Sequence, residues 1–135
     1  MKINDLFSVK DKTVIITGCS SGIGLQVAKG FILNGANVIG LSRSKPLEKL
    51  NFMYFYKCDL TKELEINSVV KKLKLKNIKI NSLLNIAGIS LGKFSDVYEM
   101  NKFDKTININ LRAVYELIYK LNPFYVNGTS IINFS

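Results

Sequence analysis

A glycine-rich turn between an apolar run and an amphipathic segment limits what this chain can fold into more than any other feature. The turn reads Thr-Gly-Cys-Ser-Ser-Gly-Ile-Gly over residues 17–24, directly after the apolar run 13–16. Apolar residues then recur at helical spacing as far as residue 32. A strand, a glycine-rich turn and a helix in this order present backbone N–H groups and a helix N-terminus to an anion. The pattern predicts a βα unit that binds a pyrophosphate.

Apolar runs and amphipathic runs alternate along the rest of the chain. We expect strands at 13–17, 37–41, 53–58, 81–85 and 130–134, and helices at 23–34, 64–75 and 101–121. Strands that alternate with helices favour a parallel sheet. Right-handed crossovers then give an α/β fold, a Rossmann-type doubly wound sheet of strand order 3-2-1-4-5 between two helical layers. The length is that of one domain, residues 1–135.

The third predicted helix carries an apolar stripe and an asparagine beside it. The stripe consists of Phe103, Ile107, Leu111, Val114, Ile118 and Leu121, and we expect it to be buried. Asn110 lies next to this stripe, and an amide without hydrogen-bond partners there costs about 1–3 kcal/mol. From the residues alone, Asn110 is either a satisfied buried amide or a functional group.

The charge balance and the apolar runs narrow the possible partners. The formal net charge is +9, but only two residues are arginines and the lysines are not interleaved with aromatic residues. This predicts a solvated basic surface that helps attract a phosphorylated cofactor, and no nucleic-acid partner. No apolar run is long enough to span a membrane, and residues 1–12 lack the apolar core of a signal peptide. We therefore expect no membrane partner and a cytoplasmic location.

The two cysteines, Cys19 and Cys58, give neither a metal cluster nor a disulfide framework. Cys19 lies inside the glycine-rich turn. It is interpreted as a small residue that fits the turn, and the alternative is an oxidation-sensitive thiol at a helix N-terminus.

Four stretches in sequence order resemble the motifs of the classical short-chain dehydrogenase/reductase family. The turn resembles its T-G-x-x-x-G-x-G signature, and Cys58-Asp59-Leu60 resembles its acidic motif after the third strand. Asn85-Ile86-Ala87-Gly88 resembles its N-N-A-G motif, with Ile86 replacing the second asparagine and losing a polar group. Asn110 matches its catalytic asparagine, which holds a helix distortion and a water of the proton relay. The resemblance covers essentially the whole chain.

The resemblance implies an oxidoreductase that transfers hydride between a nicotinamide and a small alcohol or carbonyl substrate. It implies a homo-oligomer, since members commonly associate through the long helix. It assigns the cofactor site, with no metal, to Thr17, Gly18, Ser20, Ser21, Gly22, Ile23, Gly24, Ser42, Arg43, Asp59, Leu60, Asn85, Ala87 and Gly88. Asp59 would accept a hydrogen bond from the adenine amino group, and it could equally cap the turn before the next helix.

Ser42 and Arg43 bear on the choice of cofactor. An acidic residue at the end of the second strand would bind the ribose 2′-hydroxyl and select NAD. Ser42 stands there, and the guanidinium of Arg43 is available to bind a 2′-phosphate. We therefore expect NADP(H), with NAD(H) as the alternative if Arg43 is merely solvated.

The last residues resemble the family's fifth strand, just before its catalytic serine. In the favoured register Ser135 is the small residue preceding that serine; in a register one residue away, Ser135 is the catalytic serine itself. In the family the Y-x-x-x-K pair follows this strand, which places it beyond Ser135. We therefore expect an N-terminal, cofactor-binding part whose sheet is incomplete at its C-terminal edge and which is inactive alone. The alternative is a non-catalytic dinucleotide-binding module.

Overall fold

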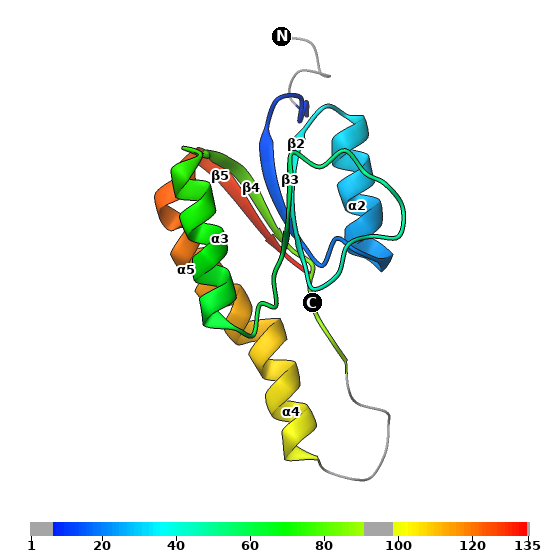
Figure 1. The fold of residues 1–135 in the computed structure, drawn as a ribbon, viewed down its shortest axis with the longest axis vertical. Coiled ribbons are helices and arrows are strands. Elements are labelled where there is room, and N and C mark those ends of the chain that lie inside the picture. The colour runs from blue at the N-terminus through cyan, green and yellow to red at the C-terminus, as the bar shows by residue number, and fades with distance from the viewer. Residues whose placement is uncertain (1–6, 91–98, 135) are drawn as a thin grey trace.

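The computed structural model describes residues 7–90 and 99–134 and contains a five-stranded parallel sheet (Figure 1). The strands are β1 (Thr13–Thr17), β2 (Asn37–Ser42), β3 (Tyr54–Lys57), β4 (Ile80–Asn85) and β5 (Tyr125–Asn133). They lie in the order β3-β2-β1-β4-β5. The predicted topology is therefore confirmed, and the first strand in sequence lies at the centre of the sheet.

Helices cover the two faces of the sheet. The helical elements are α2 (Gly22–Leu33), α3 (Glu63–Leu75), α4 (Met100–Ile107), a π-helical turn η1 (Asn108–Arg112), α5 (Ala113–Leu121) and a short η2 (Asn122–Phe124). In Figure 1, α2 lies on one face, and α3 and α5 lie side by side on the other. Because successive strand residues point to opposite faces, β1 sends Val14 and Ile16 toward α2 and Ile15 toward α3 and α5. Both faces of β1 are covered, which explains its uninterrupted apolar sequence.

The fifth strand begins earlier than predicted, at Tyr125 rather than at residue 130. The reason is a β-bulge, because Tyr125 pairs with Ile80 while the next paired residue, Ser130, faces Ser82. Gly128 has a φ of +82° in this segment, and the Thr129 hydroxyl donates to the Ile80 carbonyl oxygen. A bulge breaks the alternation by which a strand is predicted, so the sequence pattern marked only its regular second half.

The predicted buried stripe on the long helix was wrong in its first half. Phe103, Ile107 and Leu111 are 54%, 39% and 62% exposed. The buried residues are Ile109, Ala113, Leu117 and Leu121, of which only Leu121 belongs to the predicted stripe. Two features explain the difference: α4 extends beyond the end of the sheet (Figure 1), and the π-helical turn rotates the buried face.

In the described part of the chain, no helix has the length and apolarity needed to cross a membrane. Within 7–90 and 99–134, no cluster of His, Cys, Asp or Glu is arranged to hold a metal ion.

Candidate dinucleotide site

A cavity of about 800 Å³ lies at the carboxyl ends of the central strands. This is where open parallel sheets bind ligands, at the point where the strand order reverses between β1 and β4. Its walls come from the glycine-rich turn, the end of β2, the segments after β3 and β4, and η1. The lining residues are Gly18, Ser20, Ser21, Ile23, Gly24, Leu41, Ser42, Arg43, Ser44, Cys58, Leu60, Ile86, Ala87, Gly88, Ile89, Ser90, Ile109, Asn110 and Phe134.

Two glycines of the turn are required by close approach of backbone. Gly18 has a φ of +68°, and a Cβ there would lie 2.8 Å from the Cα of Ala87. A Cβ on Gly24 would lie 2.2 Å from the carbonyl oxygen of Gly18. The glycine-rich turn therefore packs tightly against the segment after β4 and against the N-terminal residues of α2. The N-cap residue Ser21 makes no side-chain cap, and no acidic residue stands in the first helical turn. The helix N-terminus therefore suits the phosphates of a dinucleotide.

Thr17 and Asn85 lie behind the cavity wall rather than on it. The Thr17 hydroxyl oxygen, fully buried, accepts hydrogen bonds from the backbone N–H groups of Ile86 and Ala87, each at 3.0 Å. The Asn85 amide donates to the side-chain oxygen of Asn133 at 2.8 Å and joins β4 to β5. Both residues fix the segment after β4, which does line the cavity. Their predicted place in the site is therefore a positioning one.

Of the two roles predicted for Asp59, the structure shows the capping of the turn before the next helix. Its carboxylate accepts hydrogen bonds from the backbone N–H and the hydroxyl of Thr61, at 3.0 and 2.7 Å. Partial burial opposes ionisation, but these bonds from Thr61 outweigh it and hold the pKa of Asp59 below its usual value. The side chain caps the turn, whereas its neighbours Cys58 and Leu60 line the cavity. A contact between Asp59 and adenine stays a prediction.

The end of β2 supplies hydroxyl groups and one positive charge. The side-chain oxygens of Ser20 and Ser42 lie 2.8 Å apart in one hydrogen bond, so the turn and β2 meet here. Arg43 and Ser44 continue the wall. Among the described residues that line the cavity, Arg43 is the only charged one. This end of the cavity therefore favours an anionic group.

Asn110 lies in the π-helical turn and ties it to the segment after β4. Its side-chain oxygen accepts from the Ile89 N–H, and its side-chain nitrogen donates to the Ile89 carbonyl oxygen, both at 2.9 Å. The residue is exposed, so the expected burial beside a stripe was wrong, but both the oxygen and the nitrogen of the amide are hydrogen-bonded. Gly88 leaves room for it, because a Cβ there would lie 3.2 Å from the Asn110 oxygen. The pairing ties the helix distortion to the segment after β4, and the catalytic role that the resemblance implied for Asn110 stays a prediction.

Sequence reasoning missed part of the cavity lining. Ile89, Ile109 and Phe134 add apolar surface to it, and Ser90 adds a hydroxyl. Phe134 follows the last strand, and its N–H donates to the Asn85 carbonyl oxygen at 3.0 Å. The rule that parallel strands end at one edge could have found Phe134, but nothing in the sequence placed Ile109 there. Ser135 lies outside the described residues.

The two cysteines are buried, and their thiols are unreactive. Burial raises the pKa of the Cys19 thiol, and that of the Cys58 thiol, to about 11. Gly40 packs so close to Cys19 that a Cβ there would lie 2.7 Å from its sulfur. Cys19 is therefore a packing residue of the turn, as its small size suggested, because thiolate is the reactive form.

The sheet topology, the glycine-rich turn and the helix N-terminus beside one cavity define a dinucleotide-binding domain of the Rossmann type. Comparisons with known proteins specify it further. The family model for short chain dehydrogenases matches residues 12–135. An uncharacterised oxidoreductase of Staphylococcus saprophyticus is 32% identical over 124 residues, which cover 87% of this chain and 50% of that protein. The chain belongs to the short-chain dehydrogenase/reductase family, whose named relatives are dehydrogenases and reductases.

Solved structures give the same result. A short chain dehydrogenase from Leptospira borgpetersenii with bound NAD⁺ superposes with a TM-score of 0.79 at 26% identity, over 89% of this chain and 48% of that one. The Pseudomonas aeruginosa RhlG/NADP active-site complex superposes with a TM-score of 0.76 at 25% identity, over 87% of this chain and 49% of that one. The chain thus spans about half the length of the relatives it matches.

Proposed function

We propose that this chain is the cofactor-binding part, residues 1–135, of an NADP(H)-dependent oxidoreductase that acts on a small alcohol or carbonyl compound. A nicotinamide dinucleotide supplies or accepts the hydride in such a reaction. This chain's own residues would bind and orient it: the turn of residues 17–24 and the N-terminus of α2 at the phosphates, and Ala87 and Gly88 beneath the nicotinamide half. Asn110 would act through the segment it holds, at Ile89.

The preference for NADP(H) depends on the end of β2. Arg43 is the charged residue of that cavity wall, and the described lining contains no carboxylate that would repel a 2′-phosphate. A charge-assisted hydrogen bond is worth about 1.5–3 kcal/mol, which corresponds to roughly 10- to 100-fold in affinity. The hydroxyl groups of Ser20 and Ser42 beside it would add neutral donors.

The test is a fluorescence titration of the chain with NADPH and with NADH. We expect NADPH to bind more tightly, and Arg43→Leu to weaken NADPH by roughly 10- to 100-fold while NADH changes little. Lys45→Leu is the matched control, because it removes a positive charge two residues away that does not line the cavity. Equal losses for both nucleotides in Arg43→Leu would contradict the preference. Failure of both nucleotides to bind the wild-type chain would contradict the site.

A non-catalytic dinucleotide-binding module is the second candidate. In the family that the sequence resembles, a Tyr-x-x-x-Lys pair after the fifth strand performs the proton transfer, and residues 1–135 do not reach that position. The two candidates separate in an assay of NADPH oxidation with a panel of aldehydes and ketones. We expect this chain to bind NADPH without turnover. Turnover by a protein that contains this chain within a longer one would favour the oxidoreductase, and tight binding by a native 135-residue protein would favour the module.

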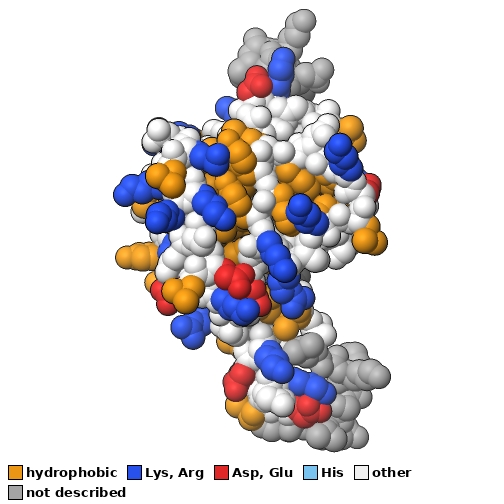
Figure 2. Space-filling model, viewed as in Figure 1, with side chains coloured by type: hydrophobic (Ala, Val, Ile, Leu, Met, Phe, Trp, Pro, Cys, Tyr) orange, Lys and Arg blue, Asp and Glu red, His pale blue; other side chains and the backbone are white. Residues whose placement is uncertain are grey.

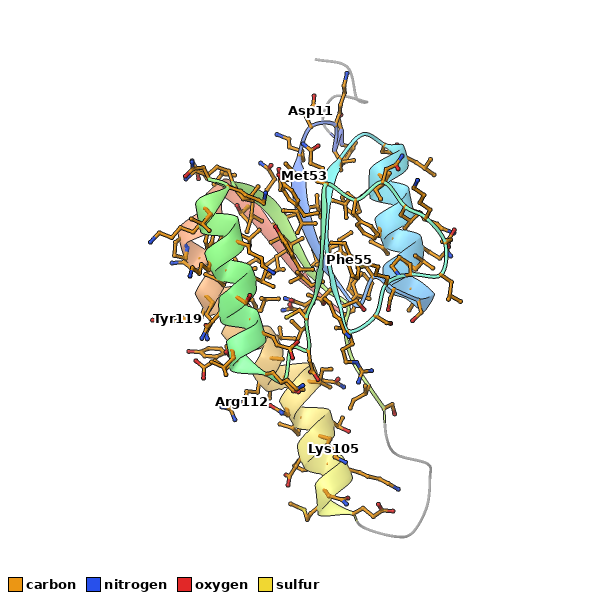
Figure 3. The ribbon with its side chains drawn as sticks, in the orientation of Figure 1. Asp11, Met53, Phe55, Lys105, Arg112 and Tyr119 are labelled. Carbon is orange, nitrogen blue, oxygen red and sulfur yellow. The ribbon has the colours of Figure 1, made fainter. Side chains whose placement is uncertain are left out.

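We also infer a homo-oligomer, with α4 and α5 in the contact. Large apolar side chains recur every three or four residues along their outer face: Met100, Phe103, Ile107, Leu111, Tyr115 and Tyr119. Tyr119 points away from the sheet (Figure 3), and exposed apolar patches of this extent mark interfaces. We expect Phe103→Ser with Leu111→Ser to shift the sedimenting species toward 15.2 kDa. The exposed pair Leu33→Ser with Leu75→Ser is the control, and a monomeric wild-type chain would contradict the inference.

A further inference from the structure

One edge of the sheet is formed by β3, and no strand in the described part of the chain pairs with its outer side. The strand is short, Tyr54–Lys57, and pairs only with β2. The Cys58 N–H donates to the Ser42 carbonyl oxygen at 2.9 Å, so this N–H points toward β2. Backbone N–H groups alternate sides along a strand, so the N–H of Tyr56 also points toward β2, and those of Phe55 and Lys57 point outward. An extended segment could pair with them.

Aromatic side chains flank this edge on both faces of the sheet. Tyr54 and Tyr56 stack with ring centroids 6.0 Å apart on the α3 face. Phe52 and Phe55 pack with centroids 5.5 Å apart on the α2 face. All four are only partly buried, and Figure 2 shows apolar surface gathered in two strips on the face that carries β3. Figure 3 places Met53 and Phe55 along the edge itself. Apolar side chains of an added strand would meet these strips on alternate sides.

Lysines surround the aromatic pair on the α3 face. The ammonium of Lys76 lies 4.5 Å from the centre of the Tyr54 ring, and that of Lys72 lies 5.3 Å from the centre of the Tyr56 ring. Lys57 is exposed at the end of β3. Lysines and aromatic residues thus alternate in space, although they do not alternate along the sequence. Figure 2 shows mainly Lys and Arg among the charged side chains of this face.

The carboxylates of the neighbouring segments are already engaged. Glu48 pairs with Lys29 at 2.6 Å. Glu65 pairs with Lys62 at 3.4 Å and accepts the N–H of Asp59 at 2.8 Å. They leave the positive charge beside Tyr54 and Tyr56 uncompensated. The β3 edge therefore attracts negative charge.

We propose that the β3 edge, residues 52–57 with Lys72 and Lys76, binds an extended acidic peptide segment of a partner protein as an added strand. Backbone pairing would provide the affinity, and the lysines would select acidic sequences. A second copy of this chain fits poorly, because two such edges would bring like charges together. A nucleic acid fits less well than a peptide, because the two ammonium groups already cover the tyrosine faces on which bases would stack.

The experiment uses a capped, fluorescein-labelled peptide in which Glu alternates with Val. We expect its anisotropy to rise on addition of the 135-residue chain, more steeply at low salt than at physiological salt. The same peptide with Lys in place of Glu, and a labelled oligothymidine, are the comparison probes. Amide hydrogen exchange at Phe55 and Lys57 should slow when the acidic peptide is bound, because their N–H groups would then be paired.

Lys72→Glu combined with Lys76→Glu should raise the dissociation constant of the acidic peptide about tenfold. Lys102→Glu combined with Lys105→Glu makes the same change in net charge on α4 and should leave it nearly unchanged. Both double variants should keep their NADPH affinity, which checks the fold. Equal effects of the two double variants, unchanged exchange at Phe55 and Lys57, or tighter binding of the lysine peptide or of oligothymidine would each overturn the proposal.

Discussion

Gly24 and Gly30 offer a matched pair of substitutions within one helix. Both lie in α2, and replacing either by alanine gains about 1 kcal/mol of helix propensity. A Cβ on Gly30 would meet nothing within 4 Å. A Cβ on Gly24 would lie 2.2 Å from the Gly18 carbonyl oxygen and 2.7 Å from its carbonyl carbon. Both neighbours are backbone atoms, so the clash is relieved only if the glycine-rich turn moves away from the helix.

The two variants should therefore change stability in opposite directions. We expect Gly30→Ala to stabilise the chain by about 0.5–1 kcal/mol. Gly24→Ala should destabilise it by about 2 kcal/mol, because overpacking against backbone costs about 3 kcal/mol or more and the propensity gain offsets only part of this. Out of a typical total of about 5–15 kcal/mol, such a difference is easily measured.

Urea denaturation followed by circular dichroism gives both free energies of unfolding, and an NADPH titration reports on the turn. Gly24→Ala should also weaken NADPH by more than about tenfold, since the displaced turn no longer presents its N–H groups to the phosphates. Gly30→Ala should bind as the wild type does. A Gly24→Ala chain as stable as Gly30→Ala, with wild-type affinity, would refute the argument from close packing.

Two further substitutions test the residues that lie outside the cavity wall. Thr17→Val leaves the N–H groups of Ile86 and Ala87 without their acceptor and should lower the free energy of unfolding by about 1–3 kcal/mol. The control, Thr13→Val at the other end of β1, should change the free energy of unfolding by less than about 0.5 kcal/mol. Asp59→Asn should lower stability at neutral pH. The lowered pKa of Asp59 means that its carboxylate contributes stability above the unfolded-state value of about 3.9, and that this contribution is lost as the pH falls below it. Urea midpoints at neutral and acidic pH test this, and Asp104→Asn on the exposed helix α4 is the control. If the stability difference between Asp59→Asn and the wild type persisted in acid, the reasoning would be contradicted.

Much of the sheet and of the glycine-rich turn could be predicted from the sequence. Strand β1 and the glycine-rich turn carry local signals, an apolar run and glycines at fixed spacing, and these depend on neighbouring residues only. The strand order followed from the handedness of parallel crossovers. The early start of β5 was not predictable, because the bulge at Gly128 and Thr129 depends on pairing with Ile80 across the sheet.

The long helix shows the same limit. Its apolar periodicity was evident in the sequence, but Phe103 and Leu111 are exposed because α4 extends beyond the sheet and no described element covers them. Periodicity identifies an apolar face and cannot say what packs on it. Asn110 was recognised by its motif, but the pairing of its amide with both backbone groups of Ile89 depends on where η1 meets the segment after β4.

The sequence by itself determined the class of fold, the place of the glycine-rich turn and the family, because these depend on residue types at short, fixed spacings. Tertiary structure decided which residues face the cavity and which support it from behind, as for Thr17 and Asn85. It also placed Lys72 and Lys76 over the tyrosines of β3. These outcomes depend on contacts between segments far apart in the chain, and such contacts are set by how the helices and strands pack together.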